Sequence, residues 1–512
     1  MTTGAGRCCI SRRFSAHDKR VNNMSNLTVC LPNGDTKTIP FQGKPALSEL
    51  LAGFDGAPQL VCGGAGVCKK CGVAAEGMLE PPPEEGACLM CRTRACGDAA
   101  VYLTGTSRLQ GIETGGAMPP YKHRPAAGGY GAALDVGTTT VALRLIDLTA
   151  NRTLCTLSAA NPQAALAADV IGRIESALSG HGAVLQRMIR SLADELLAAA
   201  CAQSGIAKEQ VGARVVTGNT TMLYLFTGRS PKTLSAAPFL ADCLFGMEER
   251  GVYYPPCPGA FVGADVACAV LASGMTNAED TSMLIDLGTN GEIALWQNHT
   301  LHCCATAAGP AFEGGGISCG SASMEGAIDR VAYANGALSV HAIGDGDARS
   351  VCGSGLIDAA AALLARGSID ETGAAEEDVL SLTPSVSLTP RDIRQLQLAK
   401  AAIAAGMQTL AQEAGVSLGQ IKTLYIAGGF GRHLPLWSAV AIGLIPAPLA
   451  ERTAILGNAA LSGASLLLLD RETKRALNAI NERAVCRNLA MSARFSDAFM
   501  ERMMFEPVDD WA

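Results

Sequence analysis

One hairpin-forming sequence occurs twice in this chain and constrains its fold more than any other feature. Residues 285–295 read IDLGTNGEIAL, and residues 134–143 read LDVGTTTVAL. Each begins as an apolar strand that reaches an aspartate, turns through small residues that accept positive φ, and returns as a second strand. Two such units roughly 150 residues apart predict a duplicated α/β fold with a nucleotide bound between its halves.

The turn of each hairpin has the chemistry of a phosphate site. Small residues leave backbone N–H groups open to a phosphate, and the aspartate at the strand end can hold Mg²⁺ directly or through water. A single turn of this kind is more often an ordinary hairpin. The matched pair favours the nucleotide site.

The composition is that of a globular protein. Of 512 residues, 48% are hydrophobic and 17% are charged, and the formal net charge of −7 offers no electrostatic surface for nucleic acid or an anionic membrane. No apolar run approaches the roughly 18 residues of a membrane-spanning helix. The 19 cysteines fit buried thiols in a reducing compartment. We therefore expect a cytoplasmic protein with no nucleic-acid or membrane partner.

Composition and periodicity divide the chain into segments. Residues 1–23 contain the twin-arginine-like SRRFS but lack the apolar stretch of an export signal. We therefore expect either that Met24 is the natural start or that this leader is disordered. Short strands and turns fill 24–107, and 108–130 form an aperiodic linker. The two halves of the α/β unit then occupy 131–255 and 256–512.

Local patterns also predict individual elements. A short helix is expected at 46–51 and a long amphipathic helix at 390–414. VVTGNTTMLYLF, at 215–226, reads as a strand with a glycine turn. The small residues of GNAALSGASLLLL, at 457–469, predict a helix packed closely on another element, and 481–512 reads as a packing segment.

Four cysteines near the N-terminus follow the pattern C-x5-C-x2-C-x19-C; they are Cys62, Cys68, Cys71 and Cys91. Plant-type 2Fe–2S ferredoxins use C-x4-C-x2-C…C, which is one residue shorter in the first gap. The glycines after Cys62 suit a loop whose backbone N–H groups bond the sulfurs of a cluster.

Two alternatives remain for this cysteine group. Cys68–Cys71 and Cys88–Cys91 are C-x2-C pairs of the kind that bind zinc, although a zinc site would leave Cys62 unused. Cys88 and Cys96 also compete with Cys91 for the position of the fourth ligand.

A series of motifs in a fixed order resembles the reductive activators of corrinoid enzymes. The motifs are CGGAGVCKKC, LDVGTTTVA, NPQ…DVIGRI, GNTTM, FVGADV, IDLGTNGEIAL, AGPAFEGG, CGSGLID, IAGGFG, IGLIP and GNAALSGA. They span the chain from 27 to its C-terminus. The family's LACQ-like segment falls on 89–92, which favours Cys91 as the fourth ligand. The stretch between Cys71 and Cys91 and the loops of the ATPase are shorter than is usual in that family.

The resemblance implies a fold, an activity and cofactors. The expected fold is a small α+β β-grasp ferredoxin domain followed by a duplicated α/β, RNase H-like ATPase of the actin and sugar-kinase type. The expected cofactors are a 2Fe–2S cluster, ATP and Mg²⁺. The expected activity is the ATP-dependent reduction of a corrinoid protein of a methyltransferase system from Co(II) to Co(I), with an upstream low-potential electron donor. The sequence leaves monomer and homodimer open.

Roles for individual residues follow from the same resemblance. Asp135 and Asp286 would hold Mg²⁺ and its waters, and Glu292 or Glu313 would orient the attacking water. Backbone N–H and hydroxyl groups that would cradle phosphate belong to Gly137, Thr138, Thr139, Gly288, Thr289 and Asn290. Gly428 and Gly429 would let adenosine lie against the backbone. Each assignment has a structural alternative. The two turns would then be ordinary tight hairpins, Glu292 and Glu313 ordinary carboxylates at a strand edge or in a loop, and Gly428 and Gly429 a close-packed turn between a strand and a helix.

Two other functions stay open from the sequence. One is a small-molecule kinase of the same superfamily with a regulatory cluster, and the other is a non-catalytic electron carrier or scaffold. Activators of 2-hydroxyacyl-CoA dehydratases share the ATPase fold but hold a 4Fe–4S cluster between subunits and lack a ferredoxin domain. The N-terminal cysteine pattern argues against that class.

Overall fold

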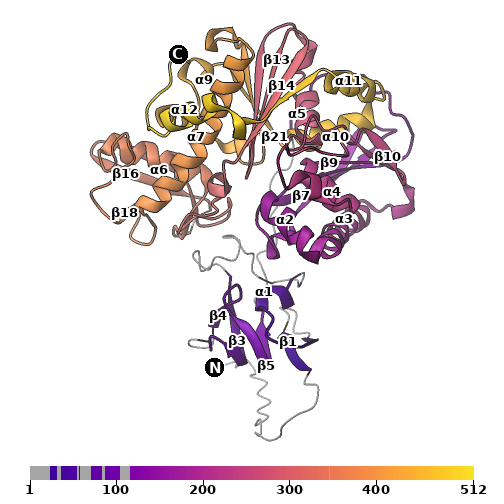
Figure 1. Cartoon of the computed structure of the whole chain (residues 1–512), viewed down its shortest axis with the longest axis vertical. Coiled ribbons are helices and arrows are strands. Elements are labelled where there is room, and N and C mark those ends of the chain that lie inside the picture. Colours follow the sequence, from indigo (N-terminus) through magenta and orange to yellow (C-terminus); the bar gives the residue numbers. More distant parts are fainter. Residues whose placement is uncertain are drawn as a thin grey trace, which may run out of the picture.

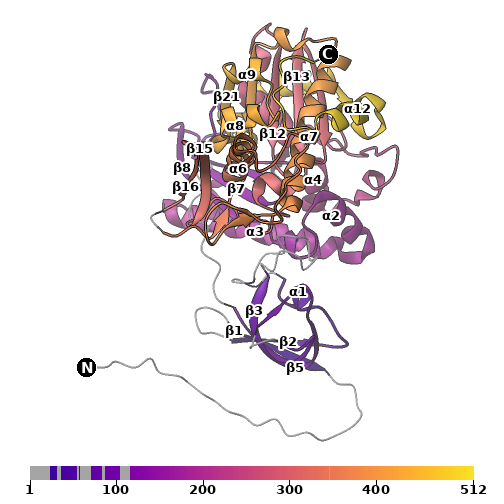
Figure 2. The same ribbon diagram turned by 90° about the vertical axis from the view of Figure 1, so that its left-hand side faces the viewer.

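The computed structural model describes residues 24–30, 36–52, 54, 57, 71–83, 87–103, 116–344 and 346–511. The expected leader at 1–23, residues 108–115 of the expected linker, and Cys62 and Cys68 lie outside these residues. Figure 1 shows a small N-terminal sheet at one end of the molecule and two larger lobes side by side at the other. The small sheet stays apart from the lobes in the view turned by 90° (Figure 2).

The N-terminal sheet has five strands, in the order β2 (Thr36–Phe41), β1 (Ser25–Cys30), β5 (Arg94–Tyr102), β3 (Gly72–Glu80) and β4 (Ala87–Leu89). Its central strands β1 and β5 run parallel, while β2 and β3 pair antiparallel with them. Alternation along β1 turns Leu27 and Val29 inward, where the short helix α1 (Leu47–Leu50) packs on the sheet. This is a β-grasp arrangement, and α1 confirms the helix expected at 46–51.

The first lobe is built on a six-stranded sheet in the order β10 (Met247–Glu249), β11 (Val252–Tyr254), β9 (Val211–Gly218), β6 (Tyr130–Val136), β7 (Thr140–Asp147) and β8 (Arg152–Ala160). Its helices are α2 (Val170–Ser176), α3 (Gly182–Ser204) and α4 (Thr220–Thr227). Strands β6 and β7 form the expected antiparallel hairpin, and β9 runs parallel to β6. The apolar side of α3, including Leu185 and Ile189, packs against this sheet.

The second lobe repeats this arrangement in a sheet ordered β21 (Thr453–Gly457), β20 (Thr423–Ala427), β12 (Ser282–Leu287), β13 (Gly291–Gln297), β14 (Thr300–Thr306) and β22 (Ala484–Arg487). Strands β12 and β13 form the second antiparallel hairpin, and β20 runs parallel to β12. The series β20-β12-β13-β14 therefore matches β9-β6-β7-β8. The duplicated α/β fold predicted from the sequence is confirmed.

The second lobe carries further elements outside its main sheet. Helix α7 (Pro390–Glu413) confirms the helix expected at 390–414, and Thr389 caps it, with Pro390 at the first helical position. The C-terminal α12 (Ala493–Glu501) packs on α7, as expected for a packing segment. The remaining strands are β15 (Ala327–Ala334), β16 (Ala337–Ala342), β17 (Ser350–Val351), β18 (Leu380–Ser381) and β19 (Ser387–Leu388), and the remaining helices are α6 (Gly353–Arg366), α8 (Leu436–Ala441), α9 (Ala447–Ala450) and α11 (Glu472–Asn481).

Two local expectations were wrong. The strand expected at 215–226 is β9 only to Gly218, and the rest is helix α4, because the Asn219 side chain accepts a hydrogen bond from the Thr221 N–H and starts a helix. The hairpin glycines Gly137 and Gly288 do not adopt positive φ. Gly137 is needed for space instead, since a Cβ there would lie 2.4 Å from the Thr140 carbonyl oxygen.

Helices α5 (Ala264–Ser273) and α10 (Ala459–Leu469) fill the space between the two lobes. Leu461, Ala464 and Leu467 of α10 pack on the first sheet, while Val266 and Val270 of α5 pack on the second. Small residues let the two helices approach closely, which confirms the close packing expected for 457–469.

Gly463→Ala is expected to lower the free energy of unfolding by about 1–3 kcal/mol. A Cβ at Gly463 would lie 2.0 Å from the Cys268 carbonyl oxygen on α5, so the helices would have to separate. Thermal unfolding measures the loss. Gly419→Ala is the matched control, because a Cβ at Gly419 meets nothing within 4 Å. An equal effect of both substitutions would contradict the close contact.

Among the helices in the described ranges, none is both long enough and apolar enough to cross a membrane.

Candidate functional site

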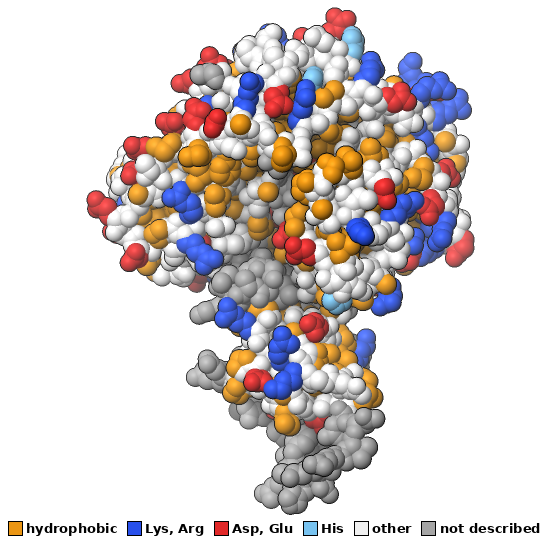
Figure 3. Space-filling model, in the orientation of Figure 1, with side chains coloured by type: hydrophobic (Ala, Val, Ile, Leu, Met, Phe, Trp, Pro, Cys, Tyr) orange, Lys and Arg blue, Asp and Glu red, His pale blue; other side chains and the backbone are white. Residues whose placement is uncertain are grey.

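The two repeated hairpins meet at the cleft between the lobes. The Thr139 and Thr289 hydroxyl oxygens lie 3.1 Å apart, and both hydroxyls donate to the Glu313 carboxylate, at 2.7 and 2.9 Å. Thr139 follows β6, Thr289 lies in the β12–β13 turn, and Glu313 ends a 3-10 turn at 310–313. Figure 3 shows a hollow between the lobes with hydrophobic side chains along its rim. The sequence repeat therefore brings two predicted phosphate-binding threonines into contact.

The aspartates at the ends of β6 and β12 lie in the same cleft. Burial, followed by repulsion from Asp265, raises the pKa of Asp135 to about 7, although Asn458 donates a 3.0 Å hydrogen bond to its carboxylate. Burial and the charges of Asp265, Asp135 and Glu313 raise the pKa of Asp286 to about 8. These two carboxylates lie close enough to repel each other, and within the described part of the chain no Lys or Arg forms an ion pair with either of them.

Further carboxylates surround this pair. Asp265 begins α5, and burial raises its pKa to about 6. Glu292, on β13, is buried, and burial together with the charges of Asp265 and Asp286 raises its pKa. Burial also raises the pKa of Glu313, opposed by the two threonine hydrogen bonds. Glu292 and Glu313 thus both lie near these aspartates, and their expected role in orienting a water stays a prediction. Asp265 was missed, although its motif FVGADV contributed to the family resemblance.

These carboxylates suit a cation whose coordination is completed by a bound ligand. Buried carboxylates that repel one another give up their protons when a cation binds between them. Within the described part of the chain, no three His, Cys, Asp or Glu side chains are placed to hold a metal ion by themselves. Mg²⁺ suits such a cleft because it usually keeps several waters and binds through one or two carboxylates plus substrate phosphates.

The turn after β6 is held by side chains to which the sequence alone assigned no role. The Gly137 carbonyl accepts a 2.8 Å hydrogen bond from the Asn161 amide, and the Thr138 carbonyl accepts one of 2.7 Å from the buried Arg173 guanidinium. Asn161 and Arg173 belong to the NPQ…DVIGRI motif, which was the available signal. Because the carbonyls of Gly137 and Thr138 accept these hydrogen bonds, the backbone of this turn is fixed in place.

The glycines expected at the adenosine site lie beside Asp286. Gly428 has φ +93°, and a Cβ there would lie 2.6 Å from the Leu287 carbonyl oxygen and 2.7 Å from Asp286 Oδ1. A Cβ at Gly429 would meet nothing within 4 Å, so that face is open to a ligand. In the β12–β13 turn, the Gly288 N–H donates to the Asn290 carbonyl at 3.3 Å and is therefore engaged within the turn.

The predicted cluster ligands fall partly within the described residues. The Sγ atoms of Cys71 and Cys91 lie 3.0 Å apart, at the edge of the N-terminal sheet. Burial raises the pKa of the Cys88 thiol, which also faces Cys71. Two thiols brought together from distant segments fit one side of a thiolate-bound metal centre, and they favour Cys91 over Cys88 because its sulfur touches that of Cys71. Cys62 and Cys68 lie outside the described residues.

Comparison with known proteins agrees with this fold. The family model "RACo middle region" matches residues 130–278, and "C-terminal domain of RACo the ASKHA domain" matches residues 280–511. The break between these models lies after α5, whereas the expected division at 255 lies after β11.

Three relatives illustrate the similarity. Corrinoid activation enzyme RamQ of Eubacterium limosum is 32% identical over 452 residues, covering 79% of this chain and 75% of that protein. The Co(II) methylated amine-specific corrinoid protein reductase of Methanosarcina barkeri is 26% identical over 387 residues, or 67% of this chain and 70% of that protein. A solved reductive activator for corrinoid, iron–sulfur protein superposes with a TM-score of 0.68 at 26% identity, covering 94% of this chain and 98% of that one. The expected ASKHA fold is thereby confirmed, and the chain belongs to the family of reductive activators of corrinoid proteins.

Proposed function

We propose that this protein uses ATP to reduce a corrinoid protein from its inactive Co(II) state to Co(I). Its relatives are a corrinoid activation enzyme and a Co(II) corrinoid protein reductase. The observation that carries the ATP-dependent part is the group of carboxylates with raised pKa values beside the paired threonine hairpins. A magnesium–nucleotide complex supplies the positive charge and the phosphate oxygens that this group lacks.

In this proposal Asp135 and Asp286 hold Mg²⁺ and its waters, one from each lobe. The phosphates bind at the turns of Thr139 and Thr289, whose hydroxyl groups exchange their hydrogen bonds to Glu313 for bonds to phosphate oxygen. Glu313 is then free to accept a bond from the attacking water. Gly429 provides the open backbone face for the adenosine.

The electron enters through the N-terminal sheet. Cys62, Cys68, Cys71 and Cys91 would hold a 2Fe–2S cluster, which when bound supplies one-electron transfer at roughly −400 mV. Co(I) is expected to be a stronger reductant than that, so electron transfer needs an additional driving force. Nucleotide states that differ in how the lobes bind the partner can supply it by changing the conformation or cobalt ligation of the partner.

The test is an anaerobic assay with reconstituted protein, a reductant and a Co(II) corrinoid protein of a methyltransferase system. The Co(I) absorbance should rise with Mg–ATP and stay low with a non-hydrolysable analogue or without nucleotide. A rate that is the same with and without ATP would contradict the coupling. Transfer of the γ-phosphate to a small alcohol or acid would favour the kinase alternative, whereas release of phosphate to water supports the activator.

A further inference from the structure

A polar cavity of about 290 Å³ lies in the first lobe, away from the nucleotide hairpins. It is enclosed by α3, β9, the end of α4 and the β10–β11 hairpin, and three arginines line it: Arg190, Arg214 and Arg250. In the β9–β6 register, Arg214 pairs with Ala132 while Gly218 pairs with Val136, beside the first phosphate turn. Arg214 thus lies four residues back along the strand, on the order of 13 Å from that turn.

The positive charge of this cavity is not balanced by protein. Glu249 is the carboxylate among the lining residues, and it accepts a 3.0 Å hydrogen bond from Arg229. In the described parts of the chain, no carboxylate forms an ion pair with Arg190, Arg214 or Arg250. Arg190 instead lies 5.4 Å from the centre of the Phe226 ring, which fixes its guanidinium at the wall. Like charges converge here, so the cavity favours an anion.

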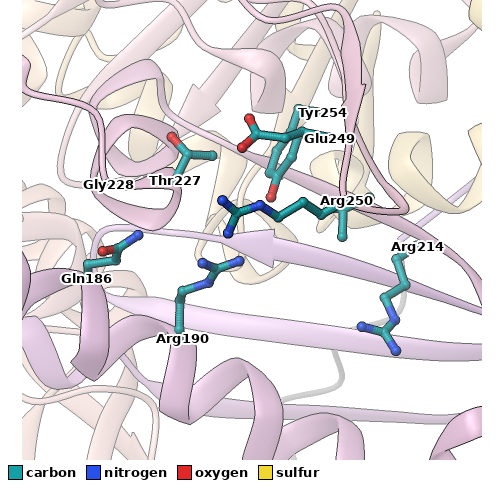
Figure 4. Close-up of a pocket in the computed structure, with 9 residues that line it drawn as sticks. Gln186, Arg190, Arg214, Thr227, Gly228, Glu249, Arg250 and Tyr254 are labelled. Atoms are coloured by element: carbon teal, nitrogen blue, oxygen red, sulfur yellow. The ribbon is translucent and has the colours of Figure 1, made fainter.

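A tyrosine adds a hydroxyl group to the lining of this cavity. Tyr254 is only 3% exposed, and it lines the cavity from β11. In Figure 4 this hydroxyl points toward the guanidinium groups of Arg190 and Arg250, which lie near each other, while Arg214 lies farther off.

We propose that this cavity is a second ligand site, which binds the phosphate or carboxylate end of a small metabolite. Arg190 and Arg250 donate to its oxygens from α3 and from the hairpin turn, and the Tyr254 hydroxyl donates from β11. Planar guanidinium groups suit both oxyanions because their N–H groups can bind two oxygens at once. The cavity volume is at the lower end of the range for small-molecule sites, so a small metabolite fits better than a nucleotide.

The test uses the full-length protein saturated with Mg²⁺ and a non-hydrolysable ATP analogue, so that the nucleotide cleft is filled. Inorganic phosphate and succinate are then titrated separately by calorimetry. We expect saturable binding of at least one of them, weakening with ionic strength. The double substitution Arg190→Gln and Arg250→Gln should weaken it by at least about tenfold, and Tyr254→Phe should weaken it several-fold.

Arg366→Gln is the matched control, because Arg366 is exposed at the end of α6, and its affinity should equal that of the wild type. Binding of the ATP analogue reports that each variant is folded, and Arg250→Gln alone changes an exposed side chain in a turn. Failure of both anions to bind the wild-type protein, or equal binding by the double variant, would overturn the proposal. Stronger binding of phosphate than of succinate identifies a phosphate-bearing ligand, and the reverse order a carboxylate. Neither result depends on whether ATP drives corrinoid reduction.

Discussion

Asp286→Asn is expected to slow ATP hydrolysis by about 100-fold while making the nucleotide-free protein more stable. The carboxylate lies at the end of β12, and burial, followed by the charges of Asp265, Asp135 and Glu313, raises its pKa to about 8. Asparagine keeps the shape and removes the charge. The substitution removes the repulsion between the carboxylates, which raises stability, and it removes the proposed magnesium ligand, which slows turnover. Turnover and stability therefore change in opposite directions.

The pH dependence of this variant has a defined sign. The folded nucleotide-free protein keeps a proton on Asp286 up to about pH 8, whereas an unfolded aspartate releases it near its ordinary value of 3.8. The contribution of Asp286 to stability therefore falls as pH rises from about 4 to about 8 and is level above that. Thermal unfolding should show the advantage of Asp286→Asn over the wild type growing across this window.

Asp378→Asn serves as the control, because Asp378 is exposed and lies far along the chain from the hairpins. It should change neither ATP turnover nor the pH profile. Unchanged turnover in Asp286→Asn would remove the magnesium role. A stability difference that is the same at both ends of the window would show that Asp286 is charged in the empty cleft.

Cys91→Ser is expected to abolish the 2Fe–2S absorbance and Co(I) formation while leaving ATP binding intact. The Cys91 sulfur touches that of Cys71, so its loss removes one of four thiolates. The nucleotide residues lie in the two lobes, apart from the N-terminal sheet (Figure 1). Iron and sulfide analysis of anaerobically reconstituted protein, with calorimetry of nucleotide binding, measures both effects.

Cys88→Ser is the matched control, because Cys88 lies three residues away on β4 and competes for the same role. It should keep the cluster spectrum and Co(I) formation. The reverse result, with a cluster in Cys91→Ser and none in Cys88→Ser, would exchange the two assignments. A preparation of the wild-type protein that holds only zinc would refute the ferredoxin reading.

The parts of the fold that rest on local pattern could be predicted from the sequence. Alternation with a period of two identified both hairpins, and the aspartates at their strand ends followed from the same pattern. The prediction of a strand through residue 226 was wrong, because TTMLYLF is rich in residues that favour strands and so resembles one in the sequence. In the structure this segment is helix α4, which is capped by the Asn219 side chain and buried between other elements.

The site residues that were not identified from the sequence, Asn458 and Asp265, are placed by long-range packing, which a local sequence pattern does not reveal. Asn458 reaches Asp135 across 323 residues, from the start of α10, and Asp265 enters the cleft from the start of α5. Both positions are fixed by how the two helices pack between the sheets. The contact of Cys71 with Cys91 likewise depends on β4, which brings the second cysteine back to the first.

The same pair of helices limits how the halves of the molecule can move. Helices α10 and α5 both lie between the two sheets and touch at Gly463, so this contact must be kept or rearranged when the lobes move relative to each other. A shift of one helix along the other would bring side chains larger than glycine against the Cys268 backbone, so a rotation that keeps Gly463 at the contact is easier to accommodate. Displacement in a rotation grows with distance from the axis. If the lobes rotate in this way between nucleotide states, their outermost surfaces travel farthest, and a partner bound there would undergo a larger displacement than one bound near the helices.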